Sequence, residues 1–285
     1  MSPAPALVPV IEGMDITAAS FIVTVYGDVV VPRGEVLWMG SLIETCGRIG
    51  IRENLVRTAV SRLVAAGQLE GERQGRRSFY RLAPAARAEF ARATARLYAH
   101  GTRPRAWIVF RMNEVPDKLR RDHHMAHLGG SCWIAPDWGA LPPGAGLVLR
   151  VPDDHPEAMP GIADLWDLDS LGLRYERVLA LFQPVADALQ SPQENRAQSP
   201  LSAQDALILR LLLVHAYRAA LLRDPLLPSA LLPTHWAGSR ARTLFRNLYL
   251  LLTPLAEAGI GTLEAAQGTL PAQSTESRKR LQMLG

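Results

Sequence analysis

The sequence predicts a mixed α/β protein made of several domains, and three observations carry this prediction. Three segments of helical periodicity are followed by a short hairpin pattern, strands alternate with helices from residue 106 onward, and a polar linker precedes a final helical stretch. The 285 residues suffice for two or three cores of ordinary domain size. A content of 48% hydrophobic and 20% charged residues is typical of a folded globular protein.

The N-terminal part reads as three helices. Residues 1–19, rich in Pro and Ala, are expected to form a disordered leader. The third helix stops at Gly67, because glycine readily adopts the left-handed conformation that follows many helices. Apolar runs and periodicity place the three helices at residues 20–31, 35–46 and 51–66.

An arginine-rich hairpin is expected directly after the third helix. The stretch "QLEGERQGRRSFYRL" reads as two short strands around a turn at Gly75. Pro84 then opens a connecting helix that reaches His100. Three helices followed by a two-stranded hairpin is the element order of a winged helix-turn-helix, and we predict this fold, with the connecting helix, for residues 20–101.

The rest of the chain divides into a central and a C-terminal part. Strands "RAWIVFRM", "SCWIA" and "GLVLRV" alternate with helices, one of them expected at 117–128, and indicate a ferredoxin-like α+β domain at 104–190. After the polar linker at 191–202, an all-helical domain is expected at 200–258 and a loose tail at 259–285. The apolar stretches of the C-terminal part are too short or too interrupted by charge to span a bilayer, and no secretory signal is recognised. We therefore expect a cytoplasmic protein.

Positive charge is concentrated in one segment of the chain. Residues 48–105 hold 13 Arg or Lys and 4 Asp or Glu, a net charge of +9, whereas residues 106–285 hold 17 basic and 18 acidic residues, a net charge of −1. Such a segment indicates a polyanionic partner for that part of the chain alone. We therefore expect its arginines to lack acidic partners within the protein.

The third helix has an apolar and a polar face. Its core-facing stripe is expected to consist of Val56, Ala59, Val60, Leu63 and Val64. The opposite face carries groups that can bond base edges or phosphates from a major groove, and the Arg57 guanidinium suits the O6 and N7 atoms of guanine. The hairpin tip would contact the DNA backbone or the minor groove, while Phe79 and Leu82 pack the hairpin onto the helices. The predicted DNA-binding residues are Asn54, Arg57, Thr58, Ser61 and Arg62 on the helix, and Arg73, Gln74, Arg76 and Arg77 on the hairpin.

Two separated stretches carry a family resemblance. The segments "GDVVVPRGEVLWMGSLI", "VRTAVSRL" and "GRRSFYRL" resemble the N-terminal domain of the PaaX family, repressors of phenylacetic acid degradation operons. The segment "VHAYRAALLRDPLLPSALLPTHWAGSRARTLFRNLY" resembles the C-terminal domain of that family, so the resemblance spans residues 20–254. It implies a transcriptional repressor that binds double-stranded operator DNA as a homodimer and is released by an aryl-CoA thioester, typically phenylacetyl-CoA.

A proline-rich stretch within the second match is the candidate effector site. Pro225, Pro228 and Pro233 break the helices and form a rigid, apolar crossing. An aryl-CoA combines an apolar head with anionic phosphates, so apolar walls beside arginines would suit it. Packing between domains, with charges satisfied locally, is the alternative reading. The candidate effector-binding residues are His215, Arg218, Arg223, His235 and Trp236.

Other patterns give little support to an enzyme or a metalloprotein. "DHHMAH" places His123, His124 and His127 on one expected helix, but no third ligand is evident, and an exposed polar turn is the better interpretation. Cys46 and Cys132 have neither zinc-site nor disulfide-framework spacing. No nucleophile–base arrangement is present, so we expect no catalytic residues, metal or cofactor. An enzyme acting on an acyl-CoA and a non-DNA interaction scaffold, each carrying a winged-helix module, are the alternatives to a repressor.

Overall fold

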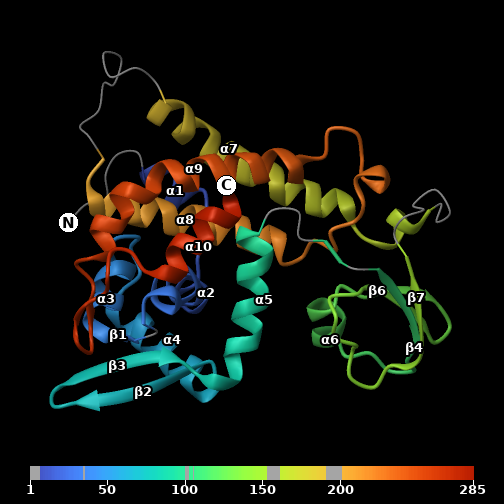
Figure 1. Ribbon diagram of the computed structural model, residues 1–285, viewed down its shortest axis with the longest axis horizontal. Coiled ribbons are helices and arrows are strands. Elements are labelled where there is room, and N and C mark those ends of the chain that lie inside the picture. The colour runs from blue at the N-terminus through green and yellow to red at the C-terminus, as the bar shows by residue number, and fades with distance from the viewer. Residues whose placement is uncertain (1–6, 35, 100–102, 105, 153–160, 191–200) are drawn as a thin grey trace. The chain divides into compact units, whose positions relative to one another are not determined.

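Helices and antiparallel sheets both build the chain, which confirms the mixed α/β class (Figure 1). The computed structural model describes residues 7–34, 36–99, 103–104, 106–152, 161–190 and 201–285. The chain divides into two compact units. The first consists of residues 1–100, 177–218 and 241–285, and the second of residues 101–176 and 219–240. Among the described helices, none is long and apolar enough to cross a membrane.

Most elements belong wholly to one unit, and three long helices contribute to both. The helices are α1 (Val8–Glu12), α2 (Ala18–Val25), α3 (Met39–Gly47), α4 (Glu53–Ala65), α5 (Arg87–Tyr98), α6 (Asp117–Asp122), α7 (Leu168–Gln190), α8 (Ala203–Leu221), α9 (Ala237–Ile260) and α10 (Thr275–Leu284). The strands are β1 (Val36–Trp38), β2 (Leu69–Gln74), β3 (Arg77–Leu82), β4 (Trp107–Arg111), β5 (Ala126–Gly129), β6 (Cys132–Pro136), β7 (Gly146–Val151), β8 (Glu264–Ala265) and β9 (Gly268–Thr269).

The first unit places a three-stranded antiparallel sheet, in the order β1-β3-β2, beside α2, α3 and α4 (Figure 1). The helix expected at 35–46 was wrong in its first turn, because Val36–Trp38 pairs with β3 and only then does α3 begin. Leu37 is buried in this strand. The hairpin pairs Leu69 with Leu82 and Gln74 with Arg77, and both Phe79 and Leu82 are buried, as expected from the sequence.

The apolar stripe of α4 is confirmed at four of its five positions. Val56, Ala59, Val60 and Leu63 are buried, whereas Val64 is 38% exposed. At 100° per residue, Val64 lies about 80° around the helix from Val56, at the margin of the stripe. The burial of the other four directs the polar face of α4 to solvent.

A fully buried carboxylate connects the end of α2 with the C-terminal helices. Asp28 lies in a π-helical turn, Tyr26–Val30, that continues α2. Its Oδ1 accepts hydrogen bonds from the hydroxyls of Tyr98 and Tyr249, each at 2.8 Å, and its Oδ2 accepts from Nε and Nη2 of Arg210 at 3.1 and 2.8 Å. Buried Arg280 of α10 donates to the Gly27 carbonyl at 2.7 Å. The turn is therefore held by α5, α8, α9 and α10 together.

The leader and tail expectations are wrong where the structure describes them. Residues 1–6 lie outside the described part, but Leu7 and Val10 are buried and α1 follows. The tail forms the hairpin β8–β9 and helix α10, whose capping box at Ser274 satisfies N-terminal backbone groups. Residues 191–200 of the expected linker lie outside the described part.

The second unit holds a four-stranded antiparallel sheet in the order β5-β6-β4-β7. The helix expected at 117–128 was wrong beyond Asp122, because His124 takes a left-handed backbone conformation (φ 50°) and β5 begins at Ala126. His127 therefore lies on a strand rather than beside His123 on a helix. No group of three or more His, Cys, Asp or Glu that could hold a metal occurs among the residues the structure describes.

Candidate nucleic-acid interface

The polar face of α4 is accessible. Asn54, Arg57 and Thr58 are exposed, as are Ser61 and Arg62. Thr58 Oγ1 donates to the Asn54 carbonyl at 2.8 Å, and Asn54 Oδ1 accepts from the Leu55 backbone N–H at 2.9 Å. These short polar groups bond their own helix, so exchanging these bonds for bonds to a ligand requires no rearrangement of the fold.

Arg57 has an acidic partner that the charge count did not anticipate. Its Nε and Nη2 each lie 2.8 Å from Oε1 of Glu53, one turn earlier on α4. Both side chains are more than half exposed, so solvent screens the pair and its net stabilisation is small. The pair holds the guanidinium extended along the helix surface.

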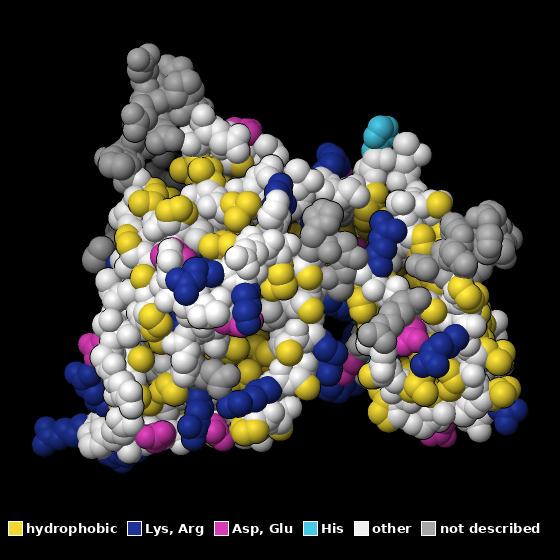
Figure 2. All heavy atoms as spheres, in the orientation of Figure 1, with side chains coloured by type: hydrophobic (Ala, Val, Ile, Leu, Met, Phe, Trp, Pro, Cys, Tyr) yellow, Lys and Arg dark blue, Asp and Glu magenta, His cyan; other side chains and the backbone are white. Residues whose placement is uncertain are grey.

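The tip of the hairpin carries the other predicted residues. Arg73 Nε donates to the Gly75 carbonyl at 3.1 Å, and Gln74 Nε2 donates to Glu72 at 2.7 Å. Arg76 is exposed at the turn. Figure 2 shows Lys and Arg side chains along the lower edge of the molecule, where Figure 1 places α4, β2 and β3, with acidic side chains among them.

Arg77 is also paired, which further corrects the expectation of unpaired arginines. Its Nη1 donates to Oε2 of Glu264, and its guanidinium carbon lies 4.7 Å from the centre of the Trp38 ring. Glu264 follows Arg77 by 187 residues, so a count over a local segment could not include it. Two of the predicted DNA-binding arginines, Arg57 and Arg77, thus have carboxylate partners.

A groove lies between α4 and the hairpin, with about 860 Å³ of free space that is partly open to solvent. It brings together Arg57, Ser61 and Arg73 of the predicted residues. The sequence prediction missed Tyr80, which stands opposite Gly71 on the neighbouring strand; a Cβ at Gly71 would lie 2.9 Å from the Tyr80 ring. The alternation around Phe79 was the available signal, since it turns its neighbours on β3 to the other face. The groove residues are Met39, Arg57, Ser61, Val64, Gly71, Glu72, Arg73, Ser78 and Tyr80.

The candidate effector residues of the first unit are engaged in packing. His215 is buried, and its Nδ1 lies 2.9 Å from Oγ1 of Thr24. Burial, with the nearby charge of Arg218, lowers the pKa of His215 to about 4, so the ring is neutral at pH 7. Arg218 Nη2 donates to the Ser20 carbonyl at 3.4 Å. These contacts favour the packing interpretation for this pair.

The other three candidates belong to the second unit. Arg223 and His235 are exposed. Trp236 is half-buried and meets Tyr175 edge to face, with ring centres 5.9 Å apart. Tyr175 in turn donates to buried Asp224 at 2.8 Å. Within this unit the segment is ordered by local bonds and ring packing.

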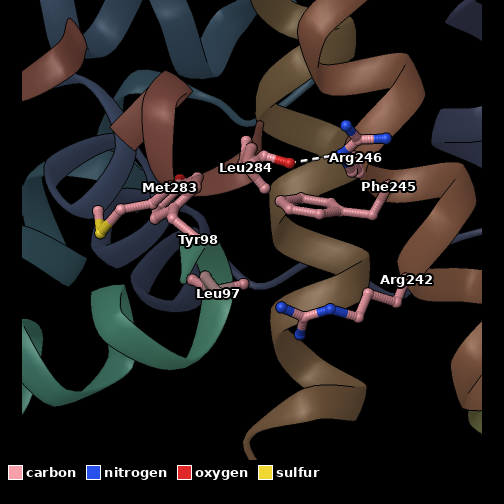
Figure 3. Close-up of a pocket in the computed structure, with 7 residues that line it drawn as sticks. All are labelled: Leu97, Tyr98, Arg242, Phe245, Arg246, Met283 and Leu284. Atoms are coloured by element: carbon pink, nitrogen blue, oxygen red, sulfur yellow. Dashed lines mark hydrogen bonds between the residues drawn. The ribbon is translucent and has the colours of Figure 1, made fainter. Parts of the chain in front are cut away.

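A pocket that the sequence prediction missed lies among α5, α9 and α10 (Figure 3). Arg246 donates to the Leu284 and Gly285 carbonyls, and Arg242 donates to the Ala99 carbonyl at 2.5 Å. The two arginines stand four residues apart on α9, a spacing visible in the sequence. The pocket has about 210 Å³ of free space, part of it open to solvent, which is too small for a whole CoA thioester. Its residues are Leu97, Tyr98, Arg242, Phe245, Arg246, Met283 and Leu284.

Two family models and one relative agree on one family. Residues 17–86 match the model of the PaaX-like protein family, and residues 166–260 match that of the PaaX-like protein C-terminal domain. The transcriptional repressor PaaX of Escherichia coli K12 is 32% identical over 288 residues, which cover 92% of this chain and 89% of that protein. A solved structure, the uncharacterized protein Rv0674 of Mycobacterium tuberculosis, is similar over 86% of this chain and 99% of its own, with 21% identity and a TM-score of 0.47. The chain belongs to the PaaX-like protein family.

Proposed function

We propose that the protein is a sequence-specific DNA-binding transcriptional repressor of an aromatic-acid catabolic operon of the phenylacetate type. The observation that carries the proposal is the exposed polar face of α4 beside an arginine-bearing hairpin, with a groove between them. The relative in Escherichia coli is named a transcriptional repressor, which supports the same function and gives no support to an enzyme.

The proposal includes a winged helix-turn-helix formed by α2, α3, α4 and the sheet β1-β3-β2, which we call the reading head. The order of these elements along the chain supports it. In this arrangement α4 is the recognition helix and β2–β3 is the wing. The polar face of α4 would enter the major groove, with Arg57 turned from Glu53 to a guanine. Arg73, Arg76 and Arg77 of the wing would bind the phosphate backbone.

We also propose a ferredoxin-like fold for the second unit. Strands β4 and β5 each pair antiparallel with β6, so they run parallel with β6 between them, and α6 connects them. This is a split β-α-β unit. The connection from β6 to β7 at residues 137–145 contains no helix, so the second crossover of that fold is reduced to a loop.

The repressor would act in the cytoplasm as a homodimer whose two recognition helices enter major grooves about 34 Å apart, or a multiple of that spacing. An aryl-CoA such as phenylacetyl-CoA would release it by binding more tightly to a state with a different spacing. No cofactor is needed for this cycle. The effector-binding residues named from the sequence stay a prediction: Arg223, His235 and Trp236 are kept as candidates for that ligand, whereas the contacts of His215 and Arg218 favour packing for these two.

A gel-shift titration on the DNA upstream of the protein's own gene tests the proposal. Arg57→Ala should cost about 1–3 kcal/mol of binding free energy and reduce the discrimination between the operator and other DNA sequences, because a base contact is lost. Arg76→Ala should weaken binding to all sequences alike and reduce the salt dependence, because a phosphate contact is lost. Arg278→Ala, on the exposed face of α10, removes the same charge away from the proposed interface and is the control.

Three outcomes would contradict the assignment. Normal operator binding by both Arg57→Ala and Arg76→Ala would refute the assignment of α4 and the wing as the DNA-binding surface. The absence of any footprint would favour a non-DNA scaffold, and turnover of aryl-CoA thioesters by the purified protein would favour an enzyme.

A further inference from the structure

The hairpin β8–β9 of the C-terminal tail is anchored beside the proposed wing. Leu263 and Leu270 flank it, are buried and are joined by a backbone hydrogen bond of 2.8 Å from the Leu270 N–H to the Leu263 carbonyl. In Figure 1 the red tail passes beside α3 and β1. The match to the C-terminal family domain covers residues 166–260, so the hairpin lies after the end of that match.

Glu264 is held in this hairpin by its backbone. Its N–H donates to Oγ of Ser41 at 2.8 Å, and Ser41 is buried on α3. The Cα of Glu264 is therefore fixed to the same helical layer that carries the proposed reading head. Because the backbone is anchored, the carboxylate reaches Arg77 across a short, defined distance.

Arg77 has its guanidinium between two partners. Nη1 donates to the Glu264 carboxylate, and the cation lies over the Trp38 ring. Both charged side chains remain about half exposed, so DNA could reach the same guanidinium. A phosphate oxygen that approaches Nη1 would compete with the carboxylate for its N–H, and from any side it would approach a second negative charge.

We propose that Glu264 is an intramolecular competitor for DNA phosphate at Arg77, so that the tail hairpin lowers the affinity of the protein for DNA. The proposal rests on the proposed DNA-binding function and adds a regulatory contact to it. Binding of Arg77 to phosphate requires the carboxylate to be displaced or the ion pair to be shared. Movement of the tail hairpin would release the arginine and tighten the grip of the wing.

The test is the variant Glu264→Gln, which keeps side-chain size and removes the charge. We expect it to bind operator about two- to fivefold more tightly than the parent, the range expected for breaking an exposed ion pair. The slope of log K against log salt should become steeper by up to about 0.9, because one further phosphate is neutralised. Glu276→Gln is the matched control, since it removes an equal charge from an exposed residue of the same tail that pairs with Lys279 at 3.6 Å.

A double-mutant cycle separates a specific contact from a general field. In an Arg77→Gln background, Glu264→Gln should change operator affinity no more than Glu276→Gln does. The proposal is overturned if Glu264→Gln binds no more tightly than Glu276→Gln, or if its gain persists without Arg77. Weaker binding by Glu264→Gln would also overturn it, because the carboxylate would then orient Arg77 for phosphate rather than compete with it. Absence of DNA binding by the parent would refute the proposed function itself, a result distinct from binding that is insensitive to Glu264.

Discussion

Asp28→Asn is expected to have a large effect on folding. The change keeps the shape of the side chain and lets Oδ1 accept from Tyr98 and Tyr249 as before. It replaces Oδ2, which accepts from Arg210 Nε and Nη2, by an amide N–H₂ that faces the same donors. Arg210 is 1% exposed, so its charge cannot turn to water.

The magnitude follows from leaving one partner of a buried ion pair uncompensated, which costs about 3–5 kcal/mol. The free energy of unfolding of an ordinary domain is about 5–15 kcal/mol, so the variant should lose a large part of its stability. Tyr249→Phe removes a single hydroxyl from the same carboxylate and should cost about 1.5–3 kcal/mol. The two variants together give a graded series.

The assay is urea denaturation at pH 7, followed by circular dichroism and tryptophan fluorescence. Glu276→Gln is the control, because its exposed pair in the same unit should contribute less than about 1 kcal/mol. A loss of less than about 1 kcal/mol in Asp28→Asn would refute the reasoning, since a buried guanidinium would then be tolerated without its carboxylate.

Two further predictions concern pH and thiol chemistry. The pKa of His215 is about 4 in the folded protein and about 6.5 in an unfolded chain, so the unfolded state binds more protons between these pH values. The free energy of unfolding should therefore keep its full value above pH 6.5 and fall by about 3 kcal/mol toward pH 4. His215→Gln should remove this dependence, which denaturation at several pH values would measure. Burial raises the pKa of the Cys46 thiol to about 12, whereas Cys132 is exposed. A colorimetric thiol reagent should therefore react with one thiol in the native protein and with two in denaturant. Rapid reaction of two thiols in the native protein would contradict the burial of Cys46.

Local sequence pattern was sufficient for α4 and the hairpin. The spacing of Val56, Ala59, Val60 and Leu63 reports which face of a helix is apolar, and a turn glycine between alternating residues reports a hairpin, so neither depends on distant contacts. The exposure of the polar face of α4 follows from the same periodicity. Which of its residues contact DNA stays a prediction.

Elements held by distant contacts could not be predicted in the same way. The hairpin β8–β9 has two-residue strands and depends on the burial of Leu263 and Leu270. Helix α10 carries Arg280, which bonds the Gly27 carbonyl 253 residues earlier. The pairing of Arg77 with Glu264 is equally remote in sequence, and periodicity carries no information on such pairs.

The surroundings of Asp28 also restrict where the proposed effector-driven movement can occur. A hinge between the proposed reading head and helices α8 and α9 would part Asp28 from Arg210 and Tyr249, and Thr24 from His215. A hinge that left either charge buried without its partner would cost about 3–5 kcal/mol. A ligand can supply only its difference in affinity for the two states, which would then have to reach about two to four powers of ten. A movement of the first unit as a body leaves all these bonds in place. If an aryl-CoA releases DNA as proposed, we therefore expect hydrogen exchange of the Asp28 and Arg210 backbone N–H groups to stay slow. A rise in their exchange on release would place the hinge inside the first unit instead.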